Sequence, residues 1–315
     1  MKAYLLHQAG QPQALKLTEI EPPRLKHDEV MVNVKAISIN PVDTKARANE
    51  GVLSWVAGDT RPVVLGWDIS GEIVEKGSAV TAFEIGDEVF GMVNFLGVGS
   101  AYAELVAAPA SQLSKKQKNI NHSESAASTL AALTALQVLN LAGVKAGEKV
   151  LIHAGSGGVG HFAVQLAKHF GCEVSSTSSA KNRDFVLSLG ADHHLDYHDG
   201  PLSEKVSGFD FVFDTVGRAV CEESISLLKP SEGRIYSITT RELSPAAQRI
   251  AGSKMIKHGY HLVKSNGEDM QTLADLLEKG ILKAHVSKEF SFEDLPKAHE
   301  AVETGRTVGK VIVSL

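Results

Sequence analysis

The chain has 315 residues, of which 43% are hydrophobic and 22% charged, the composition of a globular protein large enough for two domains. Its 32 basic and 37 acidic residues give a net charge of −5, which argues against a nucleic-acid-binding arm or a polybasic membrane anchor. We expect a cytoplasmic protein with free thiols, because the chain starts without a signal-peptide pattern, has no run apolar enough for a membrane helix, and contains only Cys172 and Cys221.

Up to about residue 120 the pattern is typical of β-structure. Alternating and β-branched residues predict strands at residues 29–40, 68–77 and 86–91, with Gly and polar turns between them. A helical stretch is then predicted from Ser123 to Leu141, and Gly143 ends it.

From residue 149 onwards, strands and helices alternate. Strands are predicted at residues 149–153, 173–177, 209–214 and 234–238. Repeated βαβ units of this kind predict an α/β domain with a doubly wound parallel sheet. Beyond about residue 265 the pattern is mixed: it predicts a helix near 269–279, a strand near 285–290, a helix near 292–303 and a closing strand at 310–314.

The strongest local motif lies where the first of these strands leads into a helix. The strand is followed by Gly155-x-Gly157-x-x-Gly160, and the next helix is amphipathic, with apolar residues along one face. Such glycines permit a tight turn, close approach of the backbone to a pyrophosphate, and close packing of helix against strand. Because strand, glycines and helix stand in this order, the motif predicts a dinucleotide-binding site rather than an ordinary Gly-rich turn.

The segment about twenty residues further on favours NADPH over NADH. NAD-binding sheets place an Asp or Glu here to bind the ribose 2′-hydroxyl. In this chain there is no carboxylate before Asp184, and the segment offers hydroxyl, amide and cationic donors in Ser178, Ser179, Lys181 and Asn182. These donors would bind a 2′-phosphate, which a carboxylate would repel. The alternative is a solvated polar loop in a protein that prefers NADH.

The order of the motifs resembles the medium-chain dehydrogenase/reductase superfamily, specifically its quinone oxidoreductase and enone reductase branch. The match covers nearly the whole chain. It runs through Asn40-Pro-Val-Asp43, Gly66-Trp-Asp68-Ile-Ser-Gly71, Phe83-Glu-Ile-Gly86-Asp87-Glu-Val, Ala101-Tyr102-Ala-Glu104, Thr134-Ala-Leu-Gln137, Ala154-Gly-Ser-Gly-Gly-Val-Gly160, Gly190-Ala-Asp192, Asp214-Thr-Val-Gly217 and Gly309-Lys-Val. So many signatures in the right order are not expected by chance.

The resemblance implies a GroES-like, β-rich catalytic domain made of residues 1–123 and 266–315, with a Rossmann NADPH-binding domain inserted at 124–265. It implies a homodimer joined through the cofactor sheets. It also implies the cofactor contacts. Thr134 lies near the nicotinamide, the loops at Val216-Gly217 and Ile238-Thr239 line the cofactor, and the turn is formed by Gly155, Gly157, Gly158, Val159 and Gly160. Tyr197 and the loop with Ser178, Ser179, Lys181 and Asn182 approach the adenosine phosphate. Relatives commonly carry a lysine at the position of Asn182, so either Lys181 or Asn182 meets the phosphate.

A catalytic zinc is not expected. The superfamily's alcohol dehydrogenases bind zinc with a Cys, then a Gly-His-Glu segment, and later a further Cys or carboxylate. The positions that align here are Asn40, Trp67 and Asp68, and an amide and an indole do not replace Cys and His as zinc ligands. No cysteine precedes Cys172, so the four-cysteine lobe for a structural zinc is also missing. The histidines between residues 193 and 198 are expected to be ordinary polar residues, because adjacent side chains of a strand point opposite ways.

Without a metal nothing lowers the pKa of an alcohol substrate, and a conjugated carbonyl is the better acceptor. Hydride from the nicotinamide adds to the β-carbon of an enone or to a quinone ring, and the charge that develops on oxygen needs hydrogen-bond donors. The candidate donors are Asn40 and Lys45. The alternatives are a turn residue before Pro41 for Asn40 and a solvated surface lysine for Lys45. Asp43 is expected to organise this loop.

Two other functions stay open. The chain can be a reductase of acrylyl-type thioesters or haloacrylates, since substrate contacts lie on loops whose shape the sequence does not define. It can also be a non-catalytic NADPH-binding protein. RNA binding calls for a basic stripe, which this acidic chain does not show. The expected partner is therefore a small quinone or enone substrate, with neither nucleic acid nor membrane.

Overall fold

The computed structural model describes all residues, 1–315, and divides them into two compact units. The β-rich unit comprises Met1–Leu133 and Val263–Leu315, and the parallel-sheet unit comprises Thr134–Leu262. Helix α4 (Leu130–Ala142) passes from the first unit into the second. The first boundary therefore lies inside a helix, between Leu133 and Thr134. This is ten residues after the boundary expected from the sequence, 123/124, which is where the pattern changes from strand to helix.

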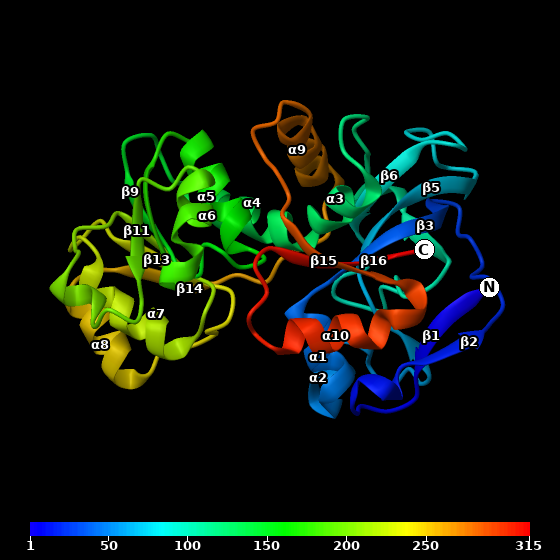
Figure 1. The fold of residues 1–315 in the computed structure, drawn as a ribbon, viewed down its shortest axis with the longest axis horizontal. Coiled ribbons are helices and arrows are strands. Elements are labelled where there is room, and N and C mark those ends of the chain that lie inside the picture. The colour runs from blue at the N-terminus through cyan, green and yellow to red at the C-terminus, as the bar shows by residue number, and fades with distance from the viewer. The chain divides into compact units, whose positions relative to one another are not determined.

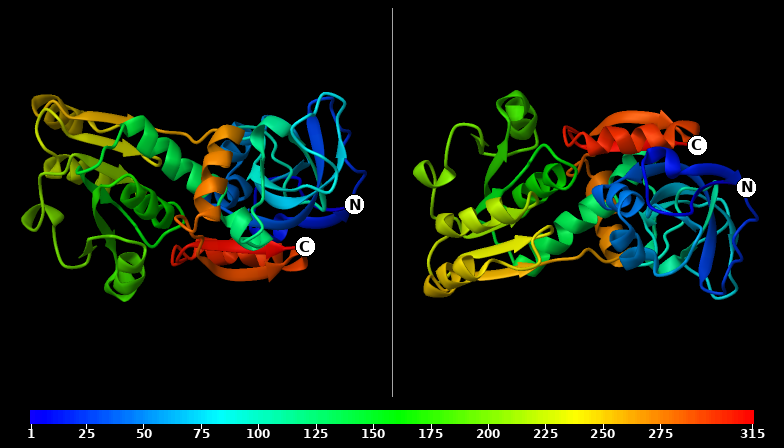
Figure 2. Two further views of the ribbon diagram at one scale, coloured as in Figure 1. Left: turned by 90° about the horizontal axis from the view of Figure 1, so that it is seen from above. Right: turned by 90° about the horizontal axis from the view of Figure 1, so that it is seen from below.

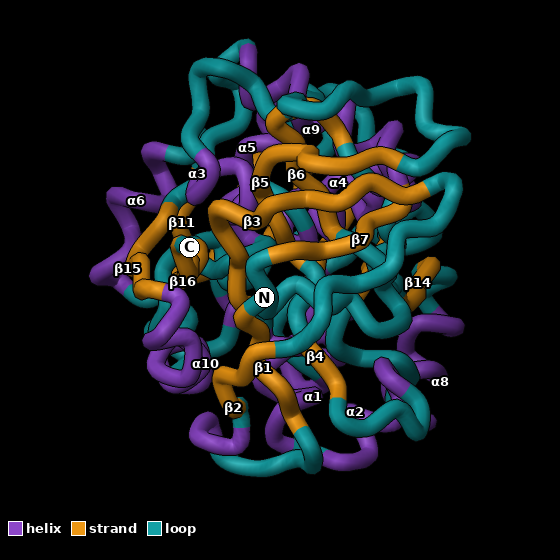
Figure 3. The backbone as a smooth tube through the Cα atoms, turned by 90° about the vertical axis from the view of Figure 1, so that its right-hand side faces the viewer, coloured by secondary structure: helices purple, strands orange, loops and turns teal.

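The β-rich unit contains two sheets. The larger has the order β15-β16-β3-β5-β6-β8, with β7 paired to β3, and the smaller has the order β2-β1-β4. The strands of the larger sheet are β3 (Glu29–Ile39), β5 (Asp68–Lys76), β6 (Glu88–Met92), β7 (Leu105–Pro109), β8 (Ser114–Lys115), β15 (Val286–Ser291) and β16 (Lys310–Ser314). Those of the smaller sheet are β1 (Lys2–Leu6), β2 (Lys16–Glu19) and β4 (Val63–Val64). Figure 3 shows β3, β5 and β6 side by side, with β7 next to β3.

Strand β3 is the centre of this unit, because it pairs with β16, β5 and β7. Its β-branched residues are buried on both faces, which explains the nearly continuous apolar run in the sequence. The last strand, β16, comes from the far end of the chain and pairs with the end of β3. Figure 2 shows β16 with β15 and the intervening helix α10 (Leu295–Glu303), coloured orange to red.

The helices of the β-rich unit begin at polar caps. Helix α1 (Pro41–Ala48) follows β3 directly, and Pro41 suits the first helical position, where no N–H is needed. Asn49, Asn121 and Asn266 each accept a backbone N–H at the start of the next helix. These helices are α2 (Glu50–Ala57), α3 (His122–Ala127) and α9 (Gly267–Glu278). No helix of the protein combines the length and apolar character that a bilayer crossing requires.

The parallel-sheet unit is the predicted doubly wound sheet. Its six strands are all parallel, in the order β11-β10-β9-β12-β13-β14. They are β9 (Lys149–Ile152), β10 (Glu173–Ser178), β11 (His193–Asp196), β12 (Phe211–Asp214), β13 (Arg234–Ser237) and β14 (Lys257–Tyr260). Figure 1 shows α5 (Gly160–His169) and α6 (Arg183–Ser188) towards one face of the sheet, and α7 (Arg218–Ser224) and α8 (Pro245–Ser253) towards the other.

The fold class predicted from the sequence, an α/β protein with a GroES-like β-rich part and a Rossmann-type sheet, is thereby confirmed. Residues 193–196, which are not among the strands predicted from the sequence, form β11, the third strand of this sheet in chain order. The strand order reverses between β9 and β12, so the connections after these neighbours leave in opposite directions. In open parallel sheets, ligands bind at the carboxyl ends of the strands at such a reversal.

Candidate functional site

The turn after β9 depends on two glycines that have no room for a side chain. A Cβ at Gly155 would lie 2.0 Å from Ser176 Oγ, and one at Gly160 would lie 2.1 Å from the carbonyl oxygen of Ala154. The Gly157 N–H closes the turn by donating to the same carbonyl at 2.8 Å. The chain can therefore fold back tightly against β10 only with glycine at these positions.

Helix α5 begins immediately after this turn. Its N-cap residue, Val159, provides no side-chain cap, and its first turn carries no acidic residue. The positive end of the helix dipole is thus offered to an anion, although the N–H groups of His161 and Ala163 already donate to the carbonyl oxygens of Gly157 and Val159 at 3.1 and 3.0 Å. Lys168 and His169 in the last turn complement the opposite end of the dipole. This arrangement suits a pyrophosphate.

The loop after β10 lies next to the turn and is joined to it. Asn182 Nδ2 donates to Ser156 Oγ at 3.0 Å, whereas Lys181 is exposed. Ser178 is buried, and its hydroxyl contacts His194 Nε2 at 2.8 Å. The sequence is compatible with either Lys181 or Asn182 at the phosphate. In the structure Lys181 is an exposed cation, whereas the Asn182 amide connects the loop after β10 to the glycine turn after β9.

The neighbouring strand end supplies a carboxylate that accepts a backbone N–H of this loop. Asp196, the last residue of β11, accepts the Ala180 N–H at 2.8 Å and the backbone N–H of His198 at 2.9 Å. Tyr197 is 57% exposed, with its ring 4.1 Å from that of His198, centroid to centroid. Ser179 and Tyr197 thus lie at the edge of a loop whose shape Asp196 holds.

The remaining predicted cofactor residues lie on α4 and at the ends of β12 and β13. Thr134 is buried in α4, Val216 is half-exposed in the loop after β12, and Ile238 is half-buried in the loop after β13. The last residue of β12, Asp214, is fully buried and bonds to both loops. In the sequence Asp214 is visible only as the first residue of the Asp214-Thr-Val-Gly217 motif, and its bonds to both loops follow from the fold.

A buried histidine stands at the end of β9. His153 contacts Thr177 Oγ1 at 3.2 Å and Ser224 Oγ at 2.8 Å. Burial lowers the pKa of His153 to about 4, so the ring is neutral at physiological pH and adds no charge to the strand ends. The Thr177 hydroxyl also accepts the Ala154 N–H at 3.0 Å, which helps to hold the start of the glycine turn.

In the β-rich unit, Asn40 lies in a buried polar cluster. Its Nδ2 donates to Asp68 Oδ2 at 2.7 Å and its Oδ1 accepts from Lys310 Nζ. Lys310 also donates to the carbonyl oxygen of Ile39 at 3.3 Å, and Asp68 Oδ1 accepts the Leu130 N–H at 3.1 Å. Asn40, Asp68 and Lys310 are at most 3% exposed. These bonds orient the Asn40 amide between a cation and a carboxylate.

The charges of this cluster are shifted by burial. Burial lowers the pKa of Lys310 and raises that of Asp68, and their opposite charges counteract both shifts. Burial, together with the nearby Asp68, raises the pKa of Asp43 to about 7. Asp43 Oδ2 accepts the Asn40 N–H at 2.5 Å, which closes the first turn of α1. Lys45, further along α1, is exposed.

Two models of known protein domains match the chain. Residues 26–118 match the alcohol dehydrogenase GroES-like domain, and residues 189–313 match the zinc-binding dehydrogenase domain. The 2-methylene-furan-3-one reductase of Solanum lycopersicum is 34% identical over 99% of this chain and 79% of that protein. The quinone oxidoreductase of Coxiella burnetii has a TM-score of 0.93 at 36% identity, over 100% of this chain and 99% of that chain. The Escherichia coli quinone oxidoreductase complexed with NADPH has a TM-score of 0.88 at 25% identity, over 100% of both chains.

The chain belongs to the medium-chain dehydrogenase/reductase superfamily. Its similarities place it among the quinone oxidoreductases and enone reductases of that superfamily, and it is an oxidoreductase. The resemblance inferred from the sequence motifs is therefore confirmed.

One of the two matching domain families is described as zinc-binding. The residues that align with the zinc ligands of alcohol dehydrogenases therefore show whether this chain could bind the ion in the same way. Asn40 is bonded to Lys310 and Asp68, as above. Trp67 is fully buried, and its indole N–H donates to the carbonyl oxygen of Gly97 at 2.9 Å. Nowhere in the structure do three or more His, Cys, Asp or Glu side chains gather as a metal site. The residues present do not fit a zinc ion.

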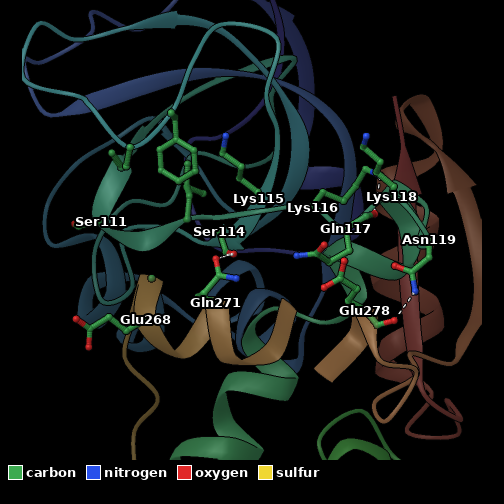
Figure 4. A pocket seen from close by; sticks show the side chains of 15 residues that line it. Ser111, Ser114, Lys115, Lys116, Gln117, Lys118, Asn119, Glu268, Gln271 and Glu278 are labelled. Carbon is green, nitrogen blue, oxygen red and sulfur yellow. Dashed lines mark hydrogen bonds between the residues drawn. The ribbon is translucent and has the colours of Figure 1, made fainter. Parts of the chain in front are cut away.

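The β-rich unit also has a groove that is separate from the candidate donors Asn40 and Lys45. Figure 4 shows it between residues 110–119 and helix α9, with Lys115, Lys116 and Lys118 on one side and Glu268 and Glu278 on the other. Its volume of about 1140 Å³ would admit a small molecule. Its walls carry both signs of charge and contain neither Asn40 nor Lys45, so it indicates no particular ligand.

Proposed function

We propose that this oxidoreductase is an NADPH-dependent, zinc-independent reductase that transfers hydride to a quinone or an α,β-unsaturated carbonyl compound. Its relatives support this acceptor class, since one is named for an enone-type furanone and others for quinones. The buried cluster of Asn40, Asp68 and Lys310 is the observation that carries the metal-independent part. The Asn40 amide connects the Lys310 ammonium to the Asp68 carboxylate, so a lysine of this chain supplies the cation of the cluster.

The cofactor is NADPH, and the residues of the parallel-sheet unit fit it. The turn at Gly155, Gly157, Gly158, Val159 and Gly160 would hold the pyrophosphate at the start of α5. Ser179, Lys181 and Tyr197 would surround the 2′-phosphate, with Ser178 and Asn182 holding that loop from behind. Thr134, Val216 and Ile238 would line the nicotinamide side. NADPH supplies the hydride, and the protein orients the acceptor and excludes water.

The proposed acceptor follows from the lack of a Lewis acid. Without one, an unactivated alcohol or carbonyl stays unreactive, whereas a conjugated acceptor needs only hydrogen-bond donors for the charge developing on its oxygen. We propose Asn40 and Lys45 as these donors. Asn40 is only 1% exposed, so its donation to an acceptor requires the cluster around it to open; the contact from Nδ2 to Ser38 O, at 3.4 Å close to the limit of a hydrogen bond, is the one that would be exchanged. Lys45 is exposed on α1, the helix that begins directly after Asn40.

The proposal is tested by steady-state oxidation of NADPH and NADH with a panel of quinones and short enones, with and without EDTA. Turnover should survive EDTA, and kcat/KM should be at least about tenfold higher with NADPH than with NADH, a difference that one good phosphate contact supplies. Lys181→Ala should raise the KM for NADPH alone. Lys145→Ala, at an exposed lysine before β9, should change neither KM.

Loss of turnover in EDTA that zinc restores would overturn the metal-independent part of the proposal. Equal KM values for the two cofactors would overturn the assignment of the 2′-phosphate site. Turnover confined to thioesters or haloacrylates would move the acceptor to the alternative class.

A further inference from the structure

Asp214 joins the two loops that follow the neighbouring strands β12 and β13. Its Oδ1 accepts the backbone N–H groups of Val216 at 2.9 Å and Gly217 at 3.1 Å. Its Oδ2 accepts the hydroxyls of Ser237 at 2.6 Å and Thr239 at 3.2 Å. One fully buried carboxyl group thus takes four hydrogen bonds, two from the loop after β12, one from the last residue of β13 and one from the loop after β13.

The bonds continue into the second loop through Ser237. Ser237 Oγ accepts the backbone N–H groups of Thr239 at 3.1 Å and Thr240 at 2.8 Å, so the loop is folded around this hydroxyl. The Asp214 carbonyl oxygen accepts the Ile238 N–H at 3.2 Å. The loop after β13 is therefore held to the end of β12 by both side chain and backbone.

The same strand end is also joined to β9, across the reversal of strand order. Thr215 Oγ1 donates to the carbonyl oxygen of His153 at 2.8 Å, one residue before the glycine turn begins at Ala154. The loop after β12 is consequently tied on one side to the start of the glycine turn and on the other, through Asp214, to the loop after β13. These are the strand ends where a doubly wound sheet binds its ligand.

We propose that Asp214 is a positioning residue for NADPH, holding Val216 and Ile238 as a single cofactor-binding wall. The inference rests on the proposed function, because it takes those two loops as the ones that line the cofactor. Asp214 does not itself reach the cofactor: it is fully buried, and its oxygens are occupied by the loops. Its effect is pre-organisation. Loops that are ordered before binding lose less entropy when NADPH binds, and affinity is higher.

The test measures the dissociation constant of NADPH by isothermal titration calorimetry for wild-type protein and Asp214→Asn. An amide at this position keeps one acceptor oxygen but turns an NH2 group towards either the N–H pair or the hydroxyl pair. We expect the dissociation constant to rise about tenfold, with kcat at saturating NADPH changed by no more than about twofold. Ser237→Ala, which removes only the loop hydroxyl, should give a smaller rise in the same direction.

Asp210→Asn is the matched control, because Asp210 is a largely buried aspartate just before the amino end of the same strand. It bonds Lys149 N at 2.8 Å and Lys229 Nζ at 2.5 Å, far along the strand from the loops in question. Its replacement should lower thermal stability but leave the NADPH dissociation constant unchanged. If the wild type does not bind NADPH, the proposed function fails. If the wild type binds NADPH and both Asp214→Asn and Ser237→Ala bind it equally well, or if Asp210→Asn weakens binding as much, this inference is wrong.

Discussion

Asn40 and Lys310 are separated by 270 positions in the chain, yet their side chains bond directly. The sequence indicates Asn40 as a candidate donor because it lies at the end of the predicted strand 29–40, where the loop begins. It gives Lys310 no role, because its partner is determined by the register of β16 against β3, which pairs Val311 with Ile39. The sequence does contain one indication: Lys310 directly precedes the apolar residues Val311 to Val313 of the closing strand, and a lysine buried with such a strand needs a hydrogen-bonding partner. Asp214 was overlooked for a related reason, since its partners lie on two loops whose shape follows from the sheet.

Asp43 should make stability depend on pH in an unusual direction for an aspartate. Its pKa is raised from 3.8 in the free side chain to about 7 by burial and by the neighbouring Asp68. Between these two values the unfolded chain gives up a proton that the folded protein keeps, so the free energy of unfolding falls as pH rises, by about 1 kcal/mol per pH unit. The contribution is fully present below pH 4 and lost above pH 7.

Asp43→Asn removes this titration and keeps an oxygen that can accept the Asn40 N–H. The free energy of unfolding of the variant minus that of the wild type should therefore be larger at pH 8 than at pH 5. Denaturant unfolding of both proteins at the two pH values measures this difference. Asp59→Asn, at an exposed aspartate, should show no such difference. An equal effect of Asp43→Asn at the two pH values would show that Asp43 ionises normally in the folded protein.

At the scale of elements, the predictable parts were those in which local pattern and tertiary role agree. Strands β3, β9 and β12 carry β-branched or apolar runs, and β10 and β13 were recognised from the alternation of strands and helices; all five were predicted to within a few residues. Strand β14 was missed because its sequence, Lys-His-Gly-Tyr, has no such run and is a strand only through its pairing with β13. The glycine turn was predicted correctly because its glycines, strand and helix follow one another directly in the chain, with no long-range partner needed to see the pattern.

The turn after β9 can be tested through its steric limits. Gly155→Ala would place Cβ 2.0 Å from Ser176 Oγ, a contact that must be relieved by a shift of the turn. We expect a rise of at least about tenfold in the KM for NADPH, because the backbone donors of the turn move away from the pyrophosphate. The double variant Gly155→Ala with Ser176→Ala removes the clashing hydroxyl and should regain part of the affinity for NADPH.

Gly160→Ala is the control for this rescue, because its Cβ would meet the backbone oxygen of Ala154 instead, and Ser176→Ala should not restore its affinity. Equal KM values for the single and double variants at position 155 would contradict this steric account.

For the whole molecule, the sequence resemblance also implied a homodimer through the cofactor sheets, and the structure offers an edge where such pairing can occur. Strand β14 is the last in the parallel sheet and pairs on one side only, with β13. The N–H groups of Lys257 and His261 donate to β13, at Gly233 O and Ser237 O. Since the N–H groups of successive residues alternate in direction along a strand, those of His258 and Tyr260 point to the open edge. An open edge of this kind is a template for a second chain.

We therefore expect a dimer in solution, with a mass of twice 33.6 kDa by light scattering coupled to size exclusion. His258→Pro removes one outward N–H and leaves the donors to β13 in place, so the dimer should dissociate at concentrations at which the wild type stays paired. His258→Ala removes the same side chain but keeps the N–H, and should remain a dimer. A monomeric wild type would refute dimerisation itself. A dimer that persists in His258→Pro would place the interface elsewhere than on the β14 edge, and a monomeric His258→Ala would assign the contact to the histidine side chain instead of the strand backbone.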